Sequence, residues 1–428
     1  MLALSITGML FILLAAGLPV AFSLALSGAA GLLAIGGTSI ASGILGTAPL
    51  SSVSSYELIS VPMFLLMAEF VILSDVANNL FRAAATWVGR VPGGLGIATA
   101  LAGAGFGAIS GSSTASAATL SAITIPAMMK QGYEPKMACG VVAISGTLAM
   151  LIPPSVALVL YGIIADVNIG KLLIAGVIPG LLVTLTIALT VYVLVKLDPR
   201  RAPPGSRYTM REKFASLKVV GPMLALFMAV TGSIYIGIAT PTEASGLGAF
   251  GAFLLALHAR KVNRKTLTEA LVRAAGTSCM IFLIIVGARI FGYFFALTQA
   301  TQDVVGAISA WHVSPYVVLA LIVVIYLILG AIMDQIAILI LTIPVVLPVM
   351  KALGFDPIWF GVLVIVIAEI GLLTPPVGLN VFVVARYTGR STREVFAGIW
   401  PHVFAHLILI AILIAFPSLI TWLPSQME

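Results

Sequence analysis

The 428-residue sequence is 61% hydrophobic and only 9% charged, with a formal net charge of +7 at pH 7. Soluble domains carry about 25% charged residues, so this chain has too little charge to cover a water-exposed surface. The composition excludes an ordinary cytosolic enzyme, a nucleic-acid-binding protein and a disordered chain. A mean hydropathy of +1.17 and long charge-free runs indicate a polytopic α-helical protein that spans a lipid bilayer.

Apolar runs follow one another along the chain, and most approach the roughly 20 residues that a spanning helix needs. Spans are predicted at 3–35, 56–80, 137–165, 171–196, 219–238, 243–258, 274–297, 358–385 and 395–422. No Lys or Arg precedes Arg82, so the first run lacks the basic start of a signal peptide and is expected to remain as a span. Two further stretches, 93–130 and 314–350, are interrupted by small or polar residues and are interpreted as re-entrant helical hairpins.

Basic residues assign the loops to the two sides of the membrane. The 196–218 linker has seven Lys or Arg residues and the 260–273 loop has five, so the positive-inside rule places both in the cytoplasm. Basic residues at both ends of the first hairpin and in the 386–394 loop place these inside as well. The loops without Lys or Arg are expected outside: 36–55, 166–170 and 298–313. Alternating the loops between the two sides gives nine spans, with the N-terminus inside and the C-terminus outside.

An internal repeat relates the two halves at a displacement of 222 residues without a gap. Gly132–Pro135 falls on Gly354–Pro357, and Pro153-Pro154 falls on Pro375-Pro376. Because the charges give the copies opposite orientations, the repeats are interpreted as inverted, a common plan among secondary transporters. The predicted units are a first repeat (1–197, with the hairpin 93–130 and the broken helix 137–165), a cytoplasmic basic linker (198–218) and a second repeat (219–428, with the hairpin 314–350 and the broken helix 358–385).

Each repeat has its double proline near the middle of a predicted helix. Proline removes a backbone donor and clashes with the preceding turn, so the helix breaks there. Broken backbone at membrane depth is tolerated only where protein or a polar cavity satisfies the freed carbonyls. Such carbonyls are ligands for a small hard cation, and half-helix N-termini favour an anion. A plain kink would be the favoured explanation for one copy, whereas two copies in register favour a binding site.

The most polar run within either hairpin is Gly107–Ser116. Its hydroxyls can serve simply as partners in helix packing, but their density at a hairpin tip favours a cluster of ligands. The repeat places Asp334 opposite Ser112, and an intramembrane carboxylate is a functional candidate by default. Asp334 is expected either to support a cation or to pin the second hairpin. Glu369 and Arg289 also lie in apolar stretches, and the sequence leaves open whether they pair.

Four motifs resemble those of one transporter family: SGSSTASAA at 110–118, GIATPTEAS at 237–245, LGAIMDQ at 329–335 and TPPVGLN at 374–380. Over essentially the whole chain, the sequence resembles the large membrane subunit of tripartite ATP-independent periplasmic (TRAP) transporters, the DctM family. The resemblance implies an elevator-type transporter of the ion-transporter superfamily, in which hairpins and broken helices slide against a scaffold. It implies sodium-driven import of an organic anion across the cytoplasmic membrane of a bacterium or archaeon.

The resemblance also implies partners. They are a small four-helix membrane subunit of the DctQ type and a periplasmic substrate-binding protein. No small-subunit sequence precedes residue 1, so an unfused large subunit is expected. The substrate class stays open among C4-dicarboxylates, sialic or other sugar acids, and keto acids.

Carried over residue by residue, the resemblance implies two sodium sites. The second-half site is expected at Gly330, Gly371, Thr374 and Val377, with Asp334 as the nearby acidic residue. The first-half site is expected at Ser110, Ser112 and Ser113 with the carbonyls of Ala149, Ile152 and Pro154. Neither hairpin has a Lys or Arg in its interior, so the anion is expected to be held loosely by half-helix N-termini and bound sodium. Polar side chains expected to help are Ser113, Thr114, Ser116 and Asn380.

Three other functions are alternatives to this one. The nearest is a divalent-anion/sodium symporter of related architecture that works without a binding protein. An intramembrane enzyme is disfavoured, because the sequence has no recognisable catalytic constellation and no HExxH motif. A passive channel is disfavoured by inverted repeats that carry two candidate cation sites.

Overall fold

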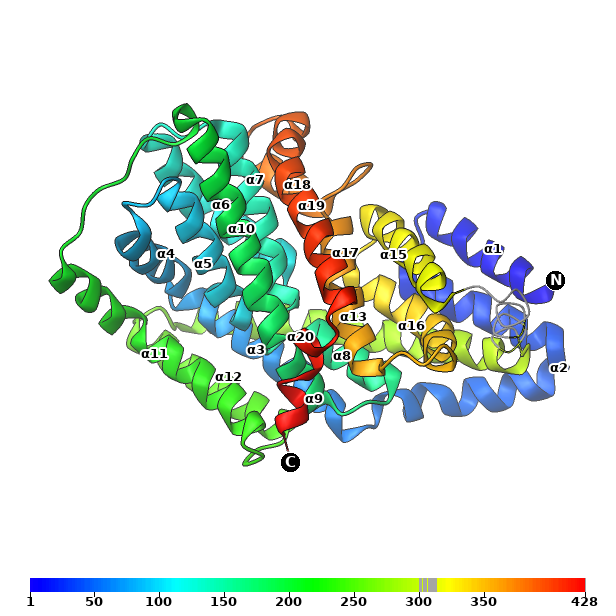
Figure 1. The fold of residues 1–428 in the computed structure, drawn as a ribbon. Helices are drawn as coiled ribbons and strands as arrows, with labels where there is room; N and C mark the ends of the chain where they lie inside the picture. Colours follow the sequence, from blue (N-terminus) through cyan, green and yellow to red (C-terminus); the bar gives the residue numbers. More distant parts are fainter. Residues whose placement is uncertain (300–301, 303–305, 307–313, 428) are drawn as a thin grey trace.

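The computed structural model describes residues 1–299, 302, 306 and 314–427, and this part is built from α-helices and short 3-10 turns without a strand (Figure 1). Seven helices of the described part are long and apolar enough to cross a membrane: Val20–Val53, Tyr56–Leu73, Ile169–Leu197, Met210–Tyr235, Arg264–Leu297, Gln335–Ala352 and Thr392–Ala415. Shorter apolar helices of 10–17 residues contribute to the hairpins and the broken helices. The prediction of an all-α, multi-pass membrane protein is confirmed.

The helices of the first half are α1 (Leu2–Ala15), α2 (Val20–Val53), α3 (Ser60–Leu73), α4 (Val76–Val88), α5 (Gly94–Ser110), α6 (Ser113–Lys130), α7 (Pro135–Thr147), α8 (Val156–Ala165), α9 (Ile169–Ala175) and α10 (Val177–Leu197). Short 3-10 turns lie between them at η1 (Tyr56–Ile59) and η2 (Leu148–Met150), and η3 (Pro199–Arg201) follows α10. The second half has α11 (Met210–Tyr235), α12 (Pro241–His258), α13 (Arg264–Leu297), α15 (Pro315–Ile332), α16 (Gln335–Ala352), α17 (Pro357–Gly371), α18 (Leu379–Thr388), α19 (Thr392–Ala415), α20 (Ser418–Thr421) and η4 (Pro424–Gln426).

The prediction of one span over 3–35 is wrong, because the structure divides this run between α1 and α2. Gly17 takes a φ of +86°, which ends α1, and Pro19 has no amide hydrogen to continue it. The prediction of a loop at 36–55 is also wrong for most of this range, because α2 continues to Val53. The backbone leaves helical geometry only at Gly36 and Gly37, so this segment is a kinked helix.

Two other predicted loops have different outcomes. The loop predicted at 260–273 is helical from Arg264, because Asn263 caps α13 in a reciprocal capping box with Thr266. Charged residues such as Lys and Glu are good helix formers, so the polar start extends the helix beyond its apolar run. The loop predicted at 298–313 falls largely outside the described residues.

The bounds of the helices repeat at the predicted displacement of 222 residues. Moved by that amount, α6 coincides with α16, and the start of α7 falls on the start of α17. Both double prolines contain a cis peptide bond. In Figure 1, α10 ends at the top, where the linker to α11 begins, whereas the equivalent helix α19 ends at the bottom near the C-terminus. The two repeats therefore run in opposite directions, as the charges predicted.

Three of the basic segments assigned to the cytoplasm meet at one face of the molecule. The backbone N–H of Glu134, after the first hairpin, donates to the carbonyl of Arg201 in the linker at 2.7 Å. The Gln131 side chain donates to the Pro203 carbonyl at 3.3 Å. From the α18–α19 loop, Arg390 reaches the sulfur of Met129 at 3.8 Å. These contacts agree with the positive-inside assignment of the three segments to one side.

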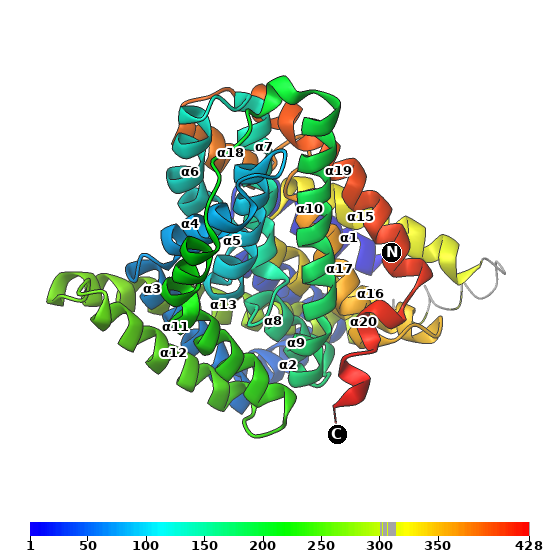
Figure 2. The same cartoon turned by 60° about the vertical axis from the view of Figure 1, so that its left-hand side comes forward.

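Two helix pairs flank the hairpins. The long helices α2 and α13 lie against one another, and a Cβ atom added to Gly28 of α2 would lie 2.7 Å from the Phe291 nitrogen of α13. Figure 2 shows α11 and α12 side by side along another flank. The TPTEA motif begins α12: Thr240 is its N-cap, and Glu243 accepts the Thr240 backbone N–H at 2.8 Å in a capping box.

Candidate functional site

Hydroxyl groups gather at the tip of the first hairpin, between α5 and α6. Gly111 follows α5 with a φ of +58°, a conformation that glycine adopts without steric cost. Ser112 is the N-cap of α6 and accepts the Ala115 N–H at 3.4 Å. The hydroxyls of Ser110 and Ser116 form a hydrogen bond of 2.5 Å across the tip. The polar run therefore forms a local cluster of oxygen atoms.

The first broken helix lies directly against this hairpin. The Ser155 hydroxyl accepts the Leu158 N–H at 3.2 Å, which starts α8, and donates to the carbonyl of Met150. A Cβ atom at Gly107 of α5 would lie 2.8 Å from the Ala149 nitrogen, so only glycine lets the two backbones approach this closely. The hairpin and the η2 turn are thus in backbone contact, as a shared site requires.

Two hydroxyl groups in this region lack a hydrogen-bond partner within the described residues. The hydroxyls of Ser113 on α6 and Ser145 on α7 are buried and have no hydrogen-bond partner among the described residues. A buried hydroxyl without a partner is destabilising, and binding a cation through its oxygen would satisfy it. Of the predicted first-half ligands, Ser110, Ser112 and Ser113 belong to the hairpin tip, and Ala149, Ile152 and Pro154 belong to the break against it.

The second hairpin and break form the equivalent arrangement. A Cβ atom at Gly330 of α15 would lie 2.6 Å from the Gly371 Cα at the end of α17. The Val377 N–H donates to the Ala331 carbonyl at 3.1 Å. The Thr374 hydroxyl donates to the Gly371 carbonyl at 2.9 Å. The structure therefore brings Gly330, Gly371, Thr374 and Val377 together.

Asp334 has a definite place in this turn. It is the N-cap of α16, and its Oδ2 accepts the Ile336 N–H at 3.1 Å. It occupies the position that Ser112 has at the start of α6, as the repeat predicts. The next residue, Gln335, is buried and donates from Nε2 to the Ile365 carbonyl of α17 at 3.2 Å. The start of α16 is thus fixed to the broken helix by side chains.

The two equivalent breaks differ in their exposure. Residues 148–161, which include the first double proline, are all buried, whereas Pro375 and Pro376 of the second are exposed. The second break therefore lies at the surface of the chain, whereas the first is enclosed by protein.

The four predicted substrate residues are not equivalent in the structure. Ser113 and Ser116 are buried in the first hairpin, and the Ser116 hydroxyl is already bonded to Ser110. Asn380 is buried and donates from Nδ2 to the Ala143 carbonyl at 3.3 Å, which ties α18 to α7. Thr114 lines a cavity of about 660 Å³ between α6 and α18.

Arg386 of α18 lines this same cavity, although nothing in the sequence marks it as a site residue. The absence of Lys and Arg from the hairpin interiors is correct, but the broken helix supplies a guanidinium beside Thr114. From the sequence, Arg386 is interpreted only as one of the basic residues that mark the cytoplasmic side. Because α6 and α18 are far apart in sequence, only their contact in the fold shows that Arg386 lies near α6.

Glu369 and Arg289 do not pair with one another. Glu369 is fully buried in α17, and its Oε1 has no hydrogen-bond partner among the described residues. Arg289 is exposed on α13 and forms no ion pair within the described ranges. The question that the sequence left open is therefore answered: the two side chains do not form an ion pair.

The donor atoms at the two turns are chemically uniform. They are hydroxyl oxygens and backbone carbonyls, with the Asp334 carboxylate in the second half. Hard cations prefer oxygen ligands, whereas transition metals favour imidazole or thiolate. Within the part of the chain that the structure describes, no three His, Cys, Asp or Glu side chains form a group.

Comparison with known proteins decides the family. The family model of the tripartite ATP-independent periplasmic transporter, DctM component, matches residues 7–419. The chain belongs to the DctM family. It is 34% identical over 404 residues to the C4-dicarboxylate TRAP transporter large permease protein DctM of Pseudomonas aeruginosa, with 94% of each chain covered. It is 32% identical over 418 residues to the sialic acid TRAP transporter large permease protein SiaM of Vibrio cholerae, with 96% of each covered.

A solved structure shares the fold of this DctM-family chain. The YdaH transporter of Alcanivorax borkumensis superimposes with a TM-score of 0.63, covering 90% of this chain and 89% of that one. The identity is 16%, so this likeness concerns the fold alone. The family match and the similar permeases show that the chain is the large permease subunit of a TRAP transporter, and its apolar helices show a multi-pass membrane protein.

Proposed function

We propose that this large permease subunit imports an organic anion by sodium symport across the cytoplasmic membrane. The observation that carries the proposal is the repeated oxygen cluster, in which a hairpin tip lies against a Pro-broken helix in each inverted half. Gly107 beside Ala149 and Gly330 beside Gly371 are the two close backbone contacts. Each contact presents carbonyl and hydroxyl oxygens at membrane depth, where a dehydrated cation needs them.

An elevator mechanism accounts for the arrangement of helices. In this proposal, the hairpins α5–α6 and α15–α16 and the two broken helices move as one body that holds sodium and anion. The pairs α2–α13 and α11–α12 serve as the scaffold. The buried first break and the exposed second break support a state that opens to one side of the membrane, and reversing that difference exposes the other side.

The proposed cargo and partners follow from the relatives. Their names include C4-dicarboxylate, sialic acid and, for a protein of Escherichia coli that is 30% identical, 2,3-diketo-L-gulonate. All are organic acids, so an organic anion is the proposed substrate class. A small four-helix subunit of the DctQ type and a periplasmic substrate-binding protein are the proposed partners. The 660 Å³ cavity with Thr114 and Arg386 is the proposed release route into the cytoplasm.

Reconstitution tests this function. The chain and its small subunit are placed in proteoliposomes, and uptake of radiolabelled cargo is measured with and without the binding protein and with and without an inward sodium gradient. The expected result is uptake only when both are present. Uptake that needs sodium but no binding protein would instead favour the independent symporter, and uptake without any gradient would indicate a channel.

Replacing Thr374 by Ala is expected to raise the sodium concentration for half-maximal uptake by about threefold to tenfold. The Thr374 hydroxyl lies at the Gly330–Gly371 contact, and a single polar interaction contributes about 0.5–1.5 kcal/mol. The measurement is initial uptake rate against external sodium. The control is Thr186→Ala in α10, where the hydroxyl bonds only to the Leu182 carbonyl of its own helix. Equal sodium dependence in both variants would remove the Thr374 side chain from the site.

A further inference from the structure

A polar cavity of about 490 Å³ lies apart from both hairpin tips. Its walls come from the η1 turn, the turn between α8 and α9, the start of α12 and one side of α13. Figure 1 shows α9 near the bottom of the molecule, whereas the basic linker leaves α10 at the top. Two of these wall segments belong to loops without Lys or Arg. One is η1 with the end of α2, and the other is the 166–170 turn. The cavity therefore belongs to the face opposite the cytoplasmic one.

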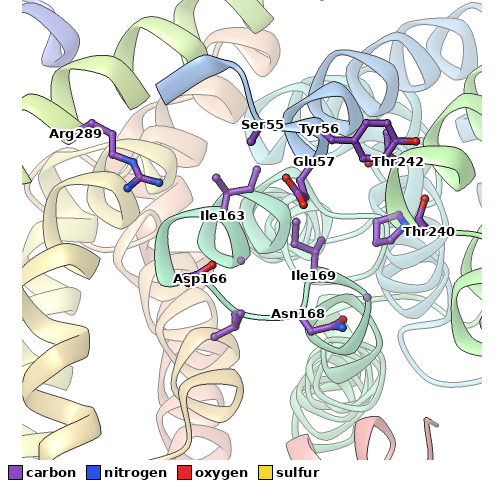
Figure 3. A pocket seen from close by; sticks show the side chains of 14 residues that line it. Ser55, Tyr56, Glu57, Ile163, Asp166, Asn168, Ile169, Thr240, Thr242 and Arg289 are labelled. Atoms are coloured by element: carbon purple, nitrogen blue, oxygen red, sulfur yellow. The ribbon is translucent and has the colours of Figure 1, made fainter. Parts of the chain in front are cut away.

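One cation lines this cavity. Arg289 lies well inside α13, a 34-residue helix whose composition qualifies it as a membrane span. A charged side chain in a spanning segment is expensive and is a functional candidate by default. In Figure 3 the Arg289 side chain points from α13 toward the region between η1 and the α8–α9 turn. With no ion-pair partner in the described ranges, its guanidinium is available for a bidentate bond to a carboxylate.

Hydrogen-bond acceptors line the rest of the cavity. Glu57 and Asp166 are exposed to it, and neither forms an ion pair in the part of the chain that is described. The buried Ser55 hydroxyl, also in the wall, has no hydrogen-bond partner among the described residues. Asn168 is exposed in the opposite wall, across from Tyr56 and Glu57 in Figure 3, and its Oδ1 accepts the Lys171 N–H at 2.9 Å. Carboxylates accept hydrogen bonds from hydroxyl groups but repel a second carboxylate.

We propose that this cavity is an outward subsite for a polyhydroxylated monocarboxylate, that is, a sugar acid. Arg289 binds the carboxylate, and Glu57 and Asp166 accept hydrogen bonds from the hydroxyl groups. A dicarboxylate fits less well, because its second carboxylate would lie beside these two acidic side chains. The volume suits a small organic acid. The proposal rests on the proposed import of an organic anion and narrows the class of that anion.

Binding measurements on the purified full-length chain in lipid nanodiscs test the subsite. The probes are gluconate, succinate and the uncharged glucose, in buffer that contains choline instead of sodium. Ligand-observed NMR titration is expected to show gluconate binding several-fold more tightly than succinate, with glucose weakest. Arg289→Gln is expected to weaken gluconate binding about tenfold or more, as loss of a charge-assisted bidentate bond predicts.

Three variants complete the test. Arg289→Lys keeps the charge and is expected to retain part of the affinity, whereas Arg264→Gln, at the exposed start of the same helix, is expected to change nothing. Glu57→Gln combined with Asp166→Asn is expected to improve succinate binding, because the repulsion is removed.

Two results would overturn the proposal. No gluconate binding to the unmodified chain, or binding that Arg289→Gln leaves unchanged, would show that the cavity is not an anion subsite. Equal affinity for succinate and gluconate would show that the assigned class is wrong. These titrations contain no sodium, so their failure leaves sodium-driven uptake standing. Conversely, uptake that ignores sodium would contradict the proposed function while gluconate binding at Arg289 persisted.

Discussion

Replacing Asp334 by Ala is expected to abolish sodium-driven uptake or reduce it to a few per cent. Asp334 is the only acidic residue of the second hairpin, and it lies at the turn that meets Gly330 and the second break. The change removes both a negative charge beside the proposed cation and the N-cap of α16. Loss of an N-cap alone costs about 1 kcal/mol, which is too little to account for complete loss of transport in a folded protein.

Asp334→Asn separates the two contributions. Asparagine is an equally good N-cap but has no charge, so uptake should fall with Asn as it does with Ala if the carboxylate supports the cation. If Asn restores uptake and Ala does not, Asp334 acts only by pinning the hairpin. Both variants must reach the membrane with the small subunit, which co-purification checks. Normal uptake by Asp334→Ala would contradict either role.

Replacing Gly330 by Ala is expected to lower the free energy of unfolding by about 1–3 kcal/mol, the usual cost of overpacking, and to remove most uptake. The added Cβ would lie 2.6 Å from the Gly371 Cα and 3.0 Å from the Ala368 carbonyl oxygen. These are backbone atoms, so α15 and α17 must separate. Separation moves apart the carbonyls proposed to bind sodium in the second half.

Gly276→Ala is the matched control, because it makes the same change inside helix α13 with no neighbouring atom within 4 Å of the new Cβ. Alanine is favoured over glycine in a helix by about 1 kcal/mol, so this variant is expected to keep or gain stability. Thermal unfolding of the purified proteins and uptake by proteoliposomes compare the two. A Gly330→Ala protein as stable and active as Gly276→Ala would show that the close contact is dispensable.

The repeat made much of the fold predictable, because proline and glycine act directly on the backbone. Pro153-Pro154 and Pro375-Pro376 marked two helix breaks, and the displacement between them relates α6 to α16. The second-half cluster of Gly330, Gly371, Thr374 and Val377 followed from the family motifs, and the structure brings these residues together. Charge placed the segments after the first hairpin, α10 and α18 at one face, because topology depends on basic loops rather than on detailed packing.

Other features depend on tertiary contacts that have no local signal. The kink at Gly36 and Gly37 leaves α2 helical on both sides. The absence of Lys and Arg from 36–55 is therefore not a sign of a loop. Arg386 lines a cavity with Thr114 because α18 packs beside α6, and no local sequence signal predicts that packing. Glu57, Asp166 and Arg289 are each more than a hundred residues apart in sequence, and no spacing rule predicts that they line one cavity.

If both halves of the repeat bind sodium during transport, the dependence of the uptake rate on sodium concentration should reveal both sites. Initial rates are measured in proteoliposomes for the unmodified protein, for Ser113→Ala in the first half and for Thr374→Ala in the second. Ser113 is suited to this test because its buried hydroxyl has no hydrogen-bond partner among the described residues, so its removal breaks no such bond. Sodium binding in both halves predicts a sigmoidal curve for the unmodified protein and a shift to higher sodium in each variant. A hyperbolic curve that neither substitution moves would contradict it.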